Sequence, residues 1–286
     1  MPRTCILTDS TICFSRITFP GQNLVSIIPH QVQIRDQTIL DSKDLGLLKS
    51  GQTSHNHNPP LVHAPSVEAF RQVFNDLGEH YQEIVAILIS SHLSQAMANA
   101  LQAAELQKSP ASVTVIDAQT TATGLGVLVQ AAAAAAQRGM PAHEINRMVR
   151  GMRRHIYAIF CLPDLTYLAR SDQLDPAQAF IGEMIGIIPI FTIENGRLMH
   201  TQKIRSSRHM VDILYEFICE FESLRVLALI QGIHYFEQES RNLRERINQN
   251  LRTIALCDHS PSLALATILG PHSIGLIAVE SSPSEI

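Results

Sequence analysis

The chain has 286 residues, a length that favours two domains over a single core. Its residues are 45% hydrophobic and 17% charged, a composition typical of globular proteins that excludes the disordered and fibrous classes. The formal net charge is −4 and the 22 basic residues are spread along the chain, so we expect no nucleic-acid partner.

Three short apolar runs predict strands in the first half of the chain. They are TCILTD at 4–9, EIVAILIS at 83–90 and SVTVIDA at 112–118. Nearly unbroken apolar strands that alternate with helical segments are typical of a parallel sheet covered on both faces. Two helices are predicted next, over 123–140 and 141–155, because the first is rich in alanine and ends at Gly139, and Pro141 opens the second.

The pattern changes after about residue 156, where a second domain is expected. Its predicted elements are a strand at 156–162, short helices at 163–171 and 175–187, a hairpin at 188–205, a helix at 208–224, a strand at 225–232, a helix at 236–251, a strand at 253–258 and a closing segment at 266–280. Asn195 and Gly196 can both adopt positive φ, as a type I′ hairpin turn requires. The predicted class is α/β in two domains, with a parallel sheet and flanking helices over 1–155 and a mixed α/β domain over 156–286.

The cysteines and the apolar runs indicate where the protein acts. Five cysteines are scattered along the chain without a CxxC pair, which favours reduced thiols in a cytosol. The first residues contain no apolar segment of signal-peptide length, and no later run has the length of a membrane span. We therefore expect a cytoplasmic protein with no membrane span.

Polar residues follow the predicted strands of the first domain. Ser90 and Ser91 lie where the second strand meets a helix, and ligands of open parallel sheets bind at that edge. A hydroxyl beside a helix N-terminus can hold a carboxylate or phosphate oxygen, although capping the helix is the commoner role of a serine there. Asp9, after the first strand, is expected to cap a helix or brace the neighbouring loop.

Five motifs occur in an order and spacing typical of one family. They are LTDST, SSHLS, VIDAQTTATGLGVLV, LTYLARSDQL and IGIIPIFTIENGRLMHTQKIR. Together they resemble the DegV family of bacterial fatty-acid-binding proteins over nearly the whole chain. The resemblance implies a two-domain DegV-like fold with a long-chain fatty acid, or a similar amphiphile, between the domains. It also implies a non-enzymatic carrier without cofactor or metal, which in some members serves a kinase-type partner protein.

The resemblance also implies which residues hold the ligand. Ser91 matches the serine that binds the carboxylate head group, and Ser90 is its neighbour. A threonine of the family pattern aligns with Thr53 if an insertion follows it. The other alignment places Val62 and His63 at that element, and both alignments stay open. The acyl tail is expected to enter an apolar tunnel.

The chain departs from the family pattern at positions linked to phosphoryl transfer. Gln173 stands where the pattern has arginine, and Ile268 stands where it has histidine. His272 follows the retained Gly-Pro pair, and with Ser273 it is a candidate ligand-binding position. Arg205 matches a basic position and either faces the head group or is a solvated surface charge. These departures predict a lipid-binding protein that is not an ordinary donor to a fatty acid kinase.

Other patterns leave alternatives open. The main alternative function is a hydrolase or transferase that uses the same interdomain cleft, and a ligand-free interaction protein is a third. The ISSHL segment lacks the Gly-x-Ser-x-Gly motif of many serine hydrolases. The histidines at 55, 57 and 63 favour a solvated loop over a zinc site. The apolar segment FIGEMIGIIPI, at 180–190, either lines an acyl tunnel or packs in the core.

Overall fold

The structure is a computed structural model that describes residues 3–49, 59–233, 236–250 and 256–281. The chain divides into two compact units. The first unit comprises Met1–Gln31, His63–Arg154 and Asn195–Arg197, and the second comprises Val32–Val62, His155–Glu194 and Leu198–Ile286. This grouping differs from the sequence-based division at residue 155. The segment Val32–Val62 belongs to the second unit, and Asn195–Arg197 at the tip of the hairpin belongs to the first.

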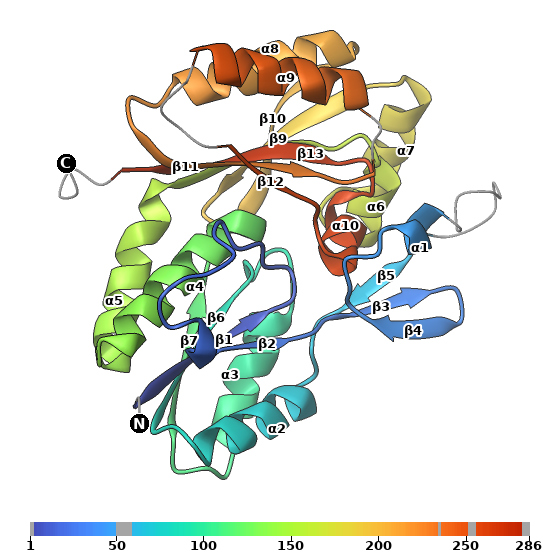
Figure 1. Cartoon of the computed structure of the whole chain (residues 1–286). Helices are drawn as coiled ribbons and strands as arrows, with labels where there is room; N and C mark the ends of the chain where they lie inside the picture. Colours follow the sequence, from blue (N-terminus) through green and yellow to red (C-terminus); the bar gives the residue numbers. More distant parts are fainter. Residues whose placement is uncertain (1–2, 50–58, 234–235, 251–255, 282–286) are drawn as a thin grey trace. The chain divides into compact units, whose positions relative to one another are not determined.

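The first unit has three layers, with helices on both faces of a parallel sheet of order β2-β1-β6-β7. Its elements are β1 (Thr4–Asp9), η1 (Gln22–Leu24), β2 (Val25–Ile28), α2 (Val67–Gly78), β6 (Glu83–Leu88), α3 (Ala96–Leu106), β7 (Ser112–Asp117), α4 (Ala122–Gln137), α5 (Ala142–Met152) and η2 (Arg153–His155). Helices α2 and α3 pack together on one face of the sheet, and α4 and α5 pack together on the other (Figure 1). The predicted parallel sheet with flanking helices is confirmed.

Burial explains why the central strands are rich in apolar residues. All six residues of β1 and all six of β6 are buried, because helices cover both faces of the sheet. Helix α4 packs closely on the loop after β1. A Cβ on Gly126 would lie 2.0 Å from the carbonyl oxygen of Cys13, so only glycine allows this approach.

The second unit is built on a mixed sheet of order β10-β9-β8-β13-β11-β12. Only the β11–β12 pair is parallel among the pairs whose register is described. The elements are β8 (Ile156–Cys161), α6 (Leu165–Arg170), α7 (Pro176–Met184), β9 (Ile188–Glu194), β10 (Arg197–Ile204), α8 (Ser207–Cys219), β11 (Leu224–Gln231), α9 (Glu237–Asn250), β12 (Leu256–His259), α10 (Leu263–Leu269) and β13 (Ile274–Glu280). Helices α8 and α9 cover one face and form the main apolar core with it (Figure 1). The predicted mixed α/β domain is confirmed.

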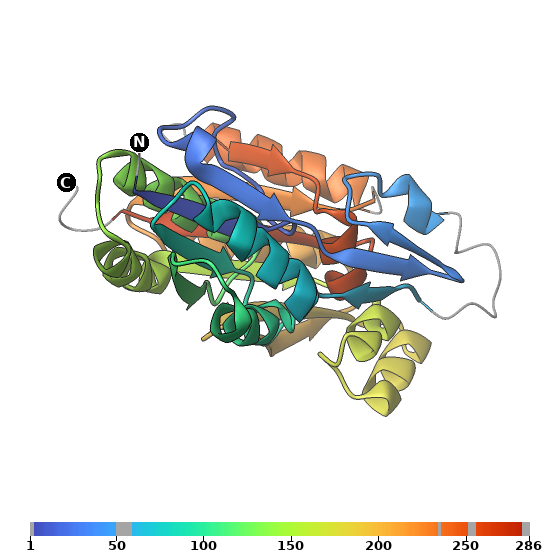
Figure 2. The ribbon, with the colours of Figure 1, turned by 90° about the horizontal axis from the view of Figure 1, so that it is seen from below.

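A small sheet of order β4-β3-β5 accompanies the second unit. Its strands are β3 (Gln31–Ile34), β4 (Gln37–Leu40) and β5 (Leu61–His63), and α1 (Gly46–Lys49) follows β4. Figure 2 shows β3 and β4 as a hairpin beside β5. This segment is tied to α10, because Asp41 Oδ1 accepts from Ala264 N at 2.8 Å and Ser42 O accepts from Leu263 N at 2.7 Å. None of these short strands was predicted from the sequence.

The predicted hairpin at 188–205 is also confirmed. Strands β9 and β10 are neighbours, and φ is 50° at Asn195 and 85° at Gly196.

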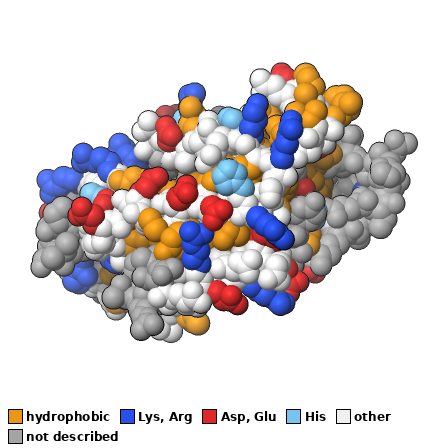
Figure 3. Space-filling model, turned by 90° about the horizontal axis from the view of Figure 1, so that it is seen from above, with side chains coloured by type: hydrophobic (Ala, Val, Ile, Leu, Met, Phe, Trp, Pro, Cys, Tyr) orange, Lys and Arg blue, Asp and Glu red, His pale blue; other side chains and the backbone are white. Residues whose placement is uncertain are grey.

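On the face seen in Figure 3, basic and acidic side chains are interspersed. Among the ion pairs of the second unit, Arg246 Nη1 lies 2.7 Å from Asp212 Oδ1. None of the helices in the described ranges is long and apolar enough to cross a membrane.

Candidate functional site

The carboxyl ends of the parallel strands in the first unit gather polar side chains. Strand β1 ends at Asp9, Ser90 follows β6, and β7 ends at Asp117. In the order β2-β1-β6-β7, the chain proceeds from β1 to a neighbour on one side and later adds β6 on the other. Ligands of open α/β sheets bind outside the strand ends at such a reversal. This edge, called here the polar edge, is the first candidate site.

Asp9 braces the polar edge. Its fully buried carboxylate accepts from Thr11 N at 3.0 Å, from Thr11 Oγ1 at 2.6 Å and from Ile89 N at 2.6 Å. A buried carboxylate is costly unless it is hydrogen-bonded, and these bonds join the loop after β1 to the end of β6. Asp9 therefore braces its neighbouring loops, as the sequence indicated.

Ser90 and Ser91 point to different partners. The Ser90 side chain is buried, and its Oγ donates to Gly196 O at 2.7 Å. Ser91 is exposed, and its Oγ donates to Asp117 Oδ2 at 2.6 Å. Because a hydroxyl has one hydrogen to donate, a ligand carboxylate that accepts from Ser91 must displace Asp117. The role of both serines as ligand contacts stays a prediction.

The hairpin turn contributes to the polar edge, since residues 195–197 belong to the first unit. A Cβ on Gly196 would lie 2.4 Å from Ser90 Oγ, so the turn approaches the serine as closely as a glycine permits. Arg197 Nε donates to His92 Nε2 at 3.2 Å. The turn therefore covers Ser90 with backbone and places the Arg197 guanidinium beside His92.

Several hydroxyls of the polar edge are buried without a hydrogen-bond partner among the described residues. They belong to Thr8, Thr120, Thr121 and Thr123. The backbone beside them is unusual, because Gln119 has φ of 54° and Ala122 has φ of 47°. Unpaired buried hydroxyls and positive φ at non-glycine residues are both unfavourable, and such features concentrate at functional sites.

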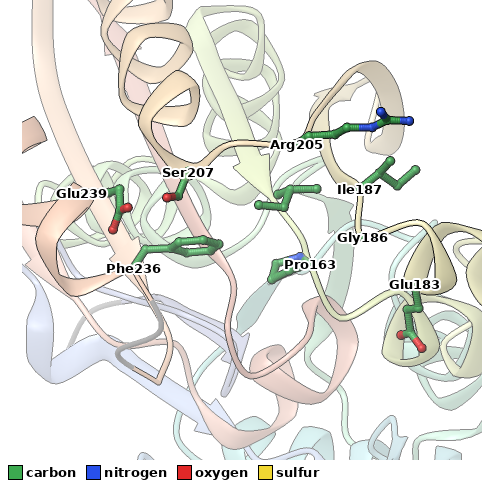
Figure 4. Close-up of a pocket in the computed structure, with 9 residues that line it drawn as sticks. Pro163, Glu183, Gly186, Ile187, Arg205, Ser207, Phe236 and Glu239 are labelled. Carbon is green, nitrogen blue, oxygen red and sulfur yellow. The ribbon is translucent and has the colours of Figure 1, made fainter.

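The second unit has a pocket of about 500 Å³ beside the ends of strands β8, β9 and β10 (Figure 4). Its lining comprises Pro163, Glu183, Gly186, Ile187, Ile188, Arg205, Ser207, Phe236 and Glu239. In Figure 4, Ser207 and Glu239 lie near Phe236, while Arg205 and Glu183 lie on the other side. The pocket, called here the sheet-end pocket, combines apolar side chains with one guanidinium and two carboxylates, and its size falls in the range of small-molecule sites.

His272 forms a close pair with an acidic residue that no sequence motif suggested. Asp164 accepts from His272 N at 2.7 Å, and its other oxygen lies 2.9 Å from His272 Nδ1. Asp164 follows Pro163 of the pocket lining. Burial, and then the charge of Asp164, raise the pKa of Tyr167 to about 12. The Oγ of Ser273 is buried and has no partner within the described ranges.

Gln173 and Ile268, the two departures from the family pattern, both take part in hydrogen bonds with Ser171. The Gln173 side chain donates through Nε2 to Ser171 O at 3.0 Å. Ile268 is fully buried in α10, and its carbonyl oxygen accepts from Ser171 Oγ at 3.0 Å. Neither side chain offers a charge or an ionisable group at this place.

The two alignments of the family threonine have different outcomes. Thr53 lies outside the described residues, as do His55 and His57. Val62 and His63 lie in β5 and are half-buried. The predicted contact of Thr53 with a ligand, and the interpretation of the histidine-rich loop, therefore stay untested.

The apolar segment 180–190 has a mixed outcome. Phe180, Ile181 and Met184 of α7 are 66%, 56% and 71% exposed, so these side chains are not in the core. Ile187 and Ile188 line the sheet-end pocket. The same stripe therefore supplies both a pocket wall and an exposed apolar surface, a division that helical periodicity alone does not reveal.

Comparison with known proteins decides the family. The family model described as DegV family matches residues 3–281. The chain belongs to the DegV family. A DegV domain-containing protein of Staphylococcus aureus is 27% identical over 285 residues, which cover 98% of this chain and 100% of the relative.

Solved structures of DegV proteins share the fold. A fatty acid binding DegV family protein of Streptococcus agalactiae has a TM-score of 0.86 at 17% identity, covering 99% of this chain and 100% of the other. The Fatty Acid Kinase (Fak) B3 protein of Streptococcus pneumoniae, loaded with linoleic acid, has a TM-score of 0.82 at 17% identity, covering 97% and 99%. The fold of this chain is therefore the two-domain DegV fold.

Sequence reasoning missed two residues that organise the candidate sites. Asp117 had a readable signal, because it ends a predicted strand at the same edge as Ser91. Asp164 had none, because its partner His272 lies 108 residues away along the chain. Only the fold brings that pair together.

Proposed function

We propose that this DegV-family protein binds a long-chain fatty acid, or a chemically similar amphiphile, and carries it without catalysing a reaction on it. The observation that carries the proposal is the DegV match over residues 3–281. Two solved DegV structures, one described as fatty acid binding and one as loaded with linoleic acid, share the fold at TM-scores of 0.86 and 0.82.

The sheet-end pocket supports an amphiphilic ligand. Ile187, Ile188 and Phe236 offer apolar contact, and each buried methylene of an acyl chain gains about 0.8 kcal/mol. Arg205 lines the same pocket and supplies a positive charge. Glu183 and Glu239 also line this pocket, and Arg205 is the one basic side chain of the lining that the structure describes. Pairing with Arg205 offsets part of the cost of removing a ligand carboxylate from water.

Ser91 is the proposed polar contact for the head group, with Ser90 as its neighbour. For this role the Ser91 hydroxyl must turn from Asp117 to the ligand, so the proposal requires a movable hydrogen bond. Thr53, Arg205, His272 and Ser273 are further proposed contacts. His272 is already oriented by Asp164, which gives its ring a fixed direction.

We also propose that the protein is not an ordinary donor to a fatty acid kinase. Gln173 and Ile268 stand at the positions where the family pattern has arginine and histidine. Neither residue can stabilise the developing charge of phosphoryl transfer as a guanidinium or an imidazole does. Rapid acyl-phosphate formation with such a kinase, ATP and oleate would contradict this part of the proposal.

Native mass spectrometry of protein purified from a bacterial host tests the binding function. We expect a bound species whose extra mass equals a long-chain fatty acid, and recovery of that species when oleate is added to delipidated protein. Protein that stays empty in both experiments overturns the proposal. A cytoplasmic location, proposed from the scattered cysteines, is tested separately by cell fractionation.

A further inference from the structure

The polar edge contains a serine and an imidazole in direct contact, apart from the serines discussed above. His30 follows β2, and Ser94 lies just before α3. The distance between His30 Nε2 and Ser94 Oγ is 3.0 Å. Both residues belong to the first unit. A hydroxyl at this distance from an imidazole nitrogen can pass its proton to that nitrogen.

The other side of the imidazole ring faces a buried carboxylate. His30 Nδ1 lies 3.9 Å from Asp9 Oδ1, and both side chains are completely buried. Ser10 Oγ lies 3.5 Å from the same nitrogen. The distance to Asp9 exceeds that of a hydrogen bond, so Asp9 acts on the ring through its charge, which favours a proton on Nδ1 and leaves the lone pair of Nε2 facing the Ser94 hydroxyl.

Ser94 is placed as a nucleophile requires. It is half-buried, whereas His30 is shielded from water. Ser94 Oγ also accepts from Ala96 N at 3.2 Å, which fixes the direction of the hydroxyl. Helix α3 begins at Ala96, so the positive end of an 11-residue helix lies beside the oxygen. A helix N-terminus stabilises negative charge that develops on a reacting carbonyl oxygen.

The order of the three residues along the chain is Asp9, His30, Ser94. Triads of aspartate, histidine and serine occur in several chain orders and on unrelated folds, and they are recognised by geometry rather than by a flanking motif. The absence of Gly-x-Ser-x-Gly therefore does not exclude Ser94 as a nucleophile. The test of that role is whether the Ser94 oxygen is more reactive than that of an ordinary surface serine.

We propose that Ser94 is an activated nucleophile and that the first unit hydrolyses activated carboxylic esters. Ser94 Oγ attacks the ester carbonyl while its proton passes to His30 Nε2. The bond to the alcohol breaks, and the alcohol leaves with that proton, so that an acyl-serine remains. Water then attacks the acyl-serine and gives a proton to His30 Nε2. The bond between the acyl group and Ser94 Oγ breaks, Oγ takes that proton back, and the acid leaves. His30 is the proposed base, and Asp9 is a positioning residue. This activity goes beyond the carrier function and does not depend on it.

An alkyl fluorophosphonate probe tests the proposal on the full chain. The serine oxygen forms a bond to phosphorus and fluoride leaves, so an activated serine gains the mass of the phosphonyl group. We expect one label per chain, located by peptide mapping at Ser94, and no label in Ser94→Ala. A wild-type protein that gains no label, or gains it elsewhere, overturns the proposal.

Ser109→Ala is the matched control. Ser109 is half-buried and accepts from the amide two residues ahead, Ala111 N at 3.1 Å, as Ser94 does from Ala96. No imidazole contacts Ser109 among the described residues. We expect this variant to be labelled at the wild-type rate. Equal loss of labelling in both variants would show that the label does not report on the His30 contact.

His30→Gln tests the base, with the exposed His80→Gln as its control. We expect His30→Gln to lower the rate of labelling and the hydrolysis of a p-nitrophenyl ester by about a hundredfold or more, since general bases contribute at least that factor. Circular dichroism verifies that each variant is folded. If His30→Gln is unfolded, Ser94→Ala decides alone. Ester hydrolysis unchanged in Ser94→Ala overturns the proposed activity.

Discussion

The polar edge of the first unit and the sheet-end pocket of the second unit use polar residues in opposite ways. At the polar edge, Asp9, Ser90 and Asp117 are bonded to neighbouring groups of the same unit. At the sheet-end pocket, apolar side chains together with Arg205, Glu183 and Glu239 surround a volume of about 500 Å³. The first arrangement fixes loop geometry, and the second leaves space for a ligand. Substitutions at the polar edge should therefore change stability most, whereas those at the pocket should change binding.

The largest expected effect is that of Asp9→Ala. The substitution leaves the amides of Thr11 and Ile89 and the hydroxyl of Thr11 without their acceptor, and each buried unsatisfied group costs about 1–3 kcal/mol. We expect the free energy of unfolding to fall by about 3 kcal/mol or more in urea denaturation. Asp76→Ala, at an exposed position of α2, should stay within about 0.5 kcal/mol. A small effect of Asp9→Ala would contradict its role as a brace.

Gly196→Ala should have the next largest effect. Gly196 has φ of 85°, and its new Cβ would lie 2.4 Å from Ser90 Oγ. Gly139 has nearly the same φ, 83°, but no atom lies within 4 Å of the place that a Cβ would take there. We expect Gly139→Ala to cost about 1 kcal/mol and Gly196→Ala about 1–3 kcal/mol more, measured by denaturant unfolding. Equal costs would mean that the turn does not press on Ser90.

Arg205→Gln tests the sheet-end pocket. The side chain is exposed, so we expect little change in stability, within about 0.5 kcal/mol. Loss of a charge-assisted hydrogen bond should weaken the binding of oleate by about tenfold, measured by isothermal titration calorimetry on delipidated protein. Arg208→Gln, which removes a charge that does not line this pocket, is the control. If both variants bind equally well, Arg205 is not a head-group contact.

The smallest expected effect is a pH dependence from Tyr167. Burial, and then Asp164, raise the pKa of this phenol from 10.0 to about 12 in the folded protein. The folded state therefore holds the proton more tightly, so the stabilisation is complete below pH 10 and is lost as the pH rises toward 12. Because the side chain is partly exposed, we expect a loss of about 1–2 kcal/mol. Tyr167→Phe should lack this part of the alkaline loss in urea denaturation at pH 9 to 12.

The prediction of the fold from sequence succeeded where local patterns and burial agree. The strand at 4–9 was predicted with the bounds that the structure has, because its central apolar residues form a run without charges, as burial on both faces requires. The hairpin turn was predicted because few residue pairs tolerate two positive φ angles. The strands β3, β4 and β5 were missed, since each has only three or four residues and is stabilised by neighbours outside its own sequence.

The α/β class, the apolar strands and the family could all be predicted from the order of the residues, because they depend on side-chain patterns that each segment carries alone. The folded chain was needed to learn that Asp164 meets His272, that Asp117 holds the Ser91 hydroxyl, and that His30 lies against Ser94. These contacts join residues 108, 26 and 64 positions apart. Hydrogen bonds act over about 3 Å, so their partners are fixed by the path of the backbone in space and leave no periodic mark in the sequence.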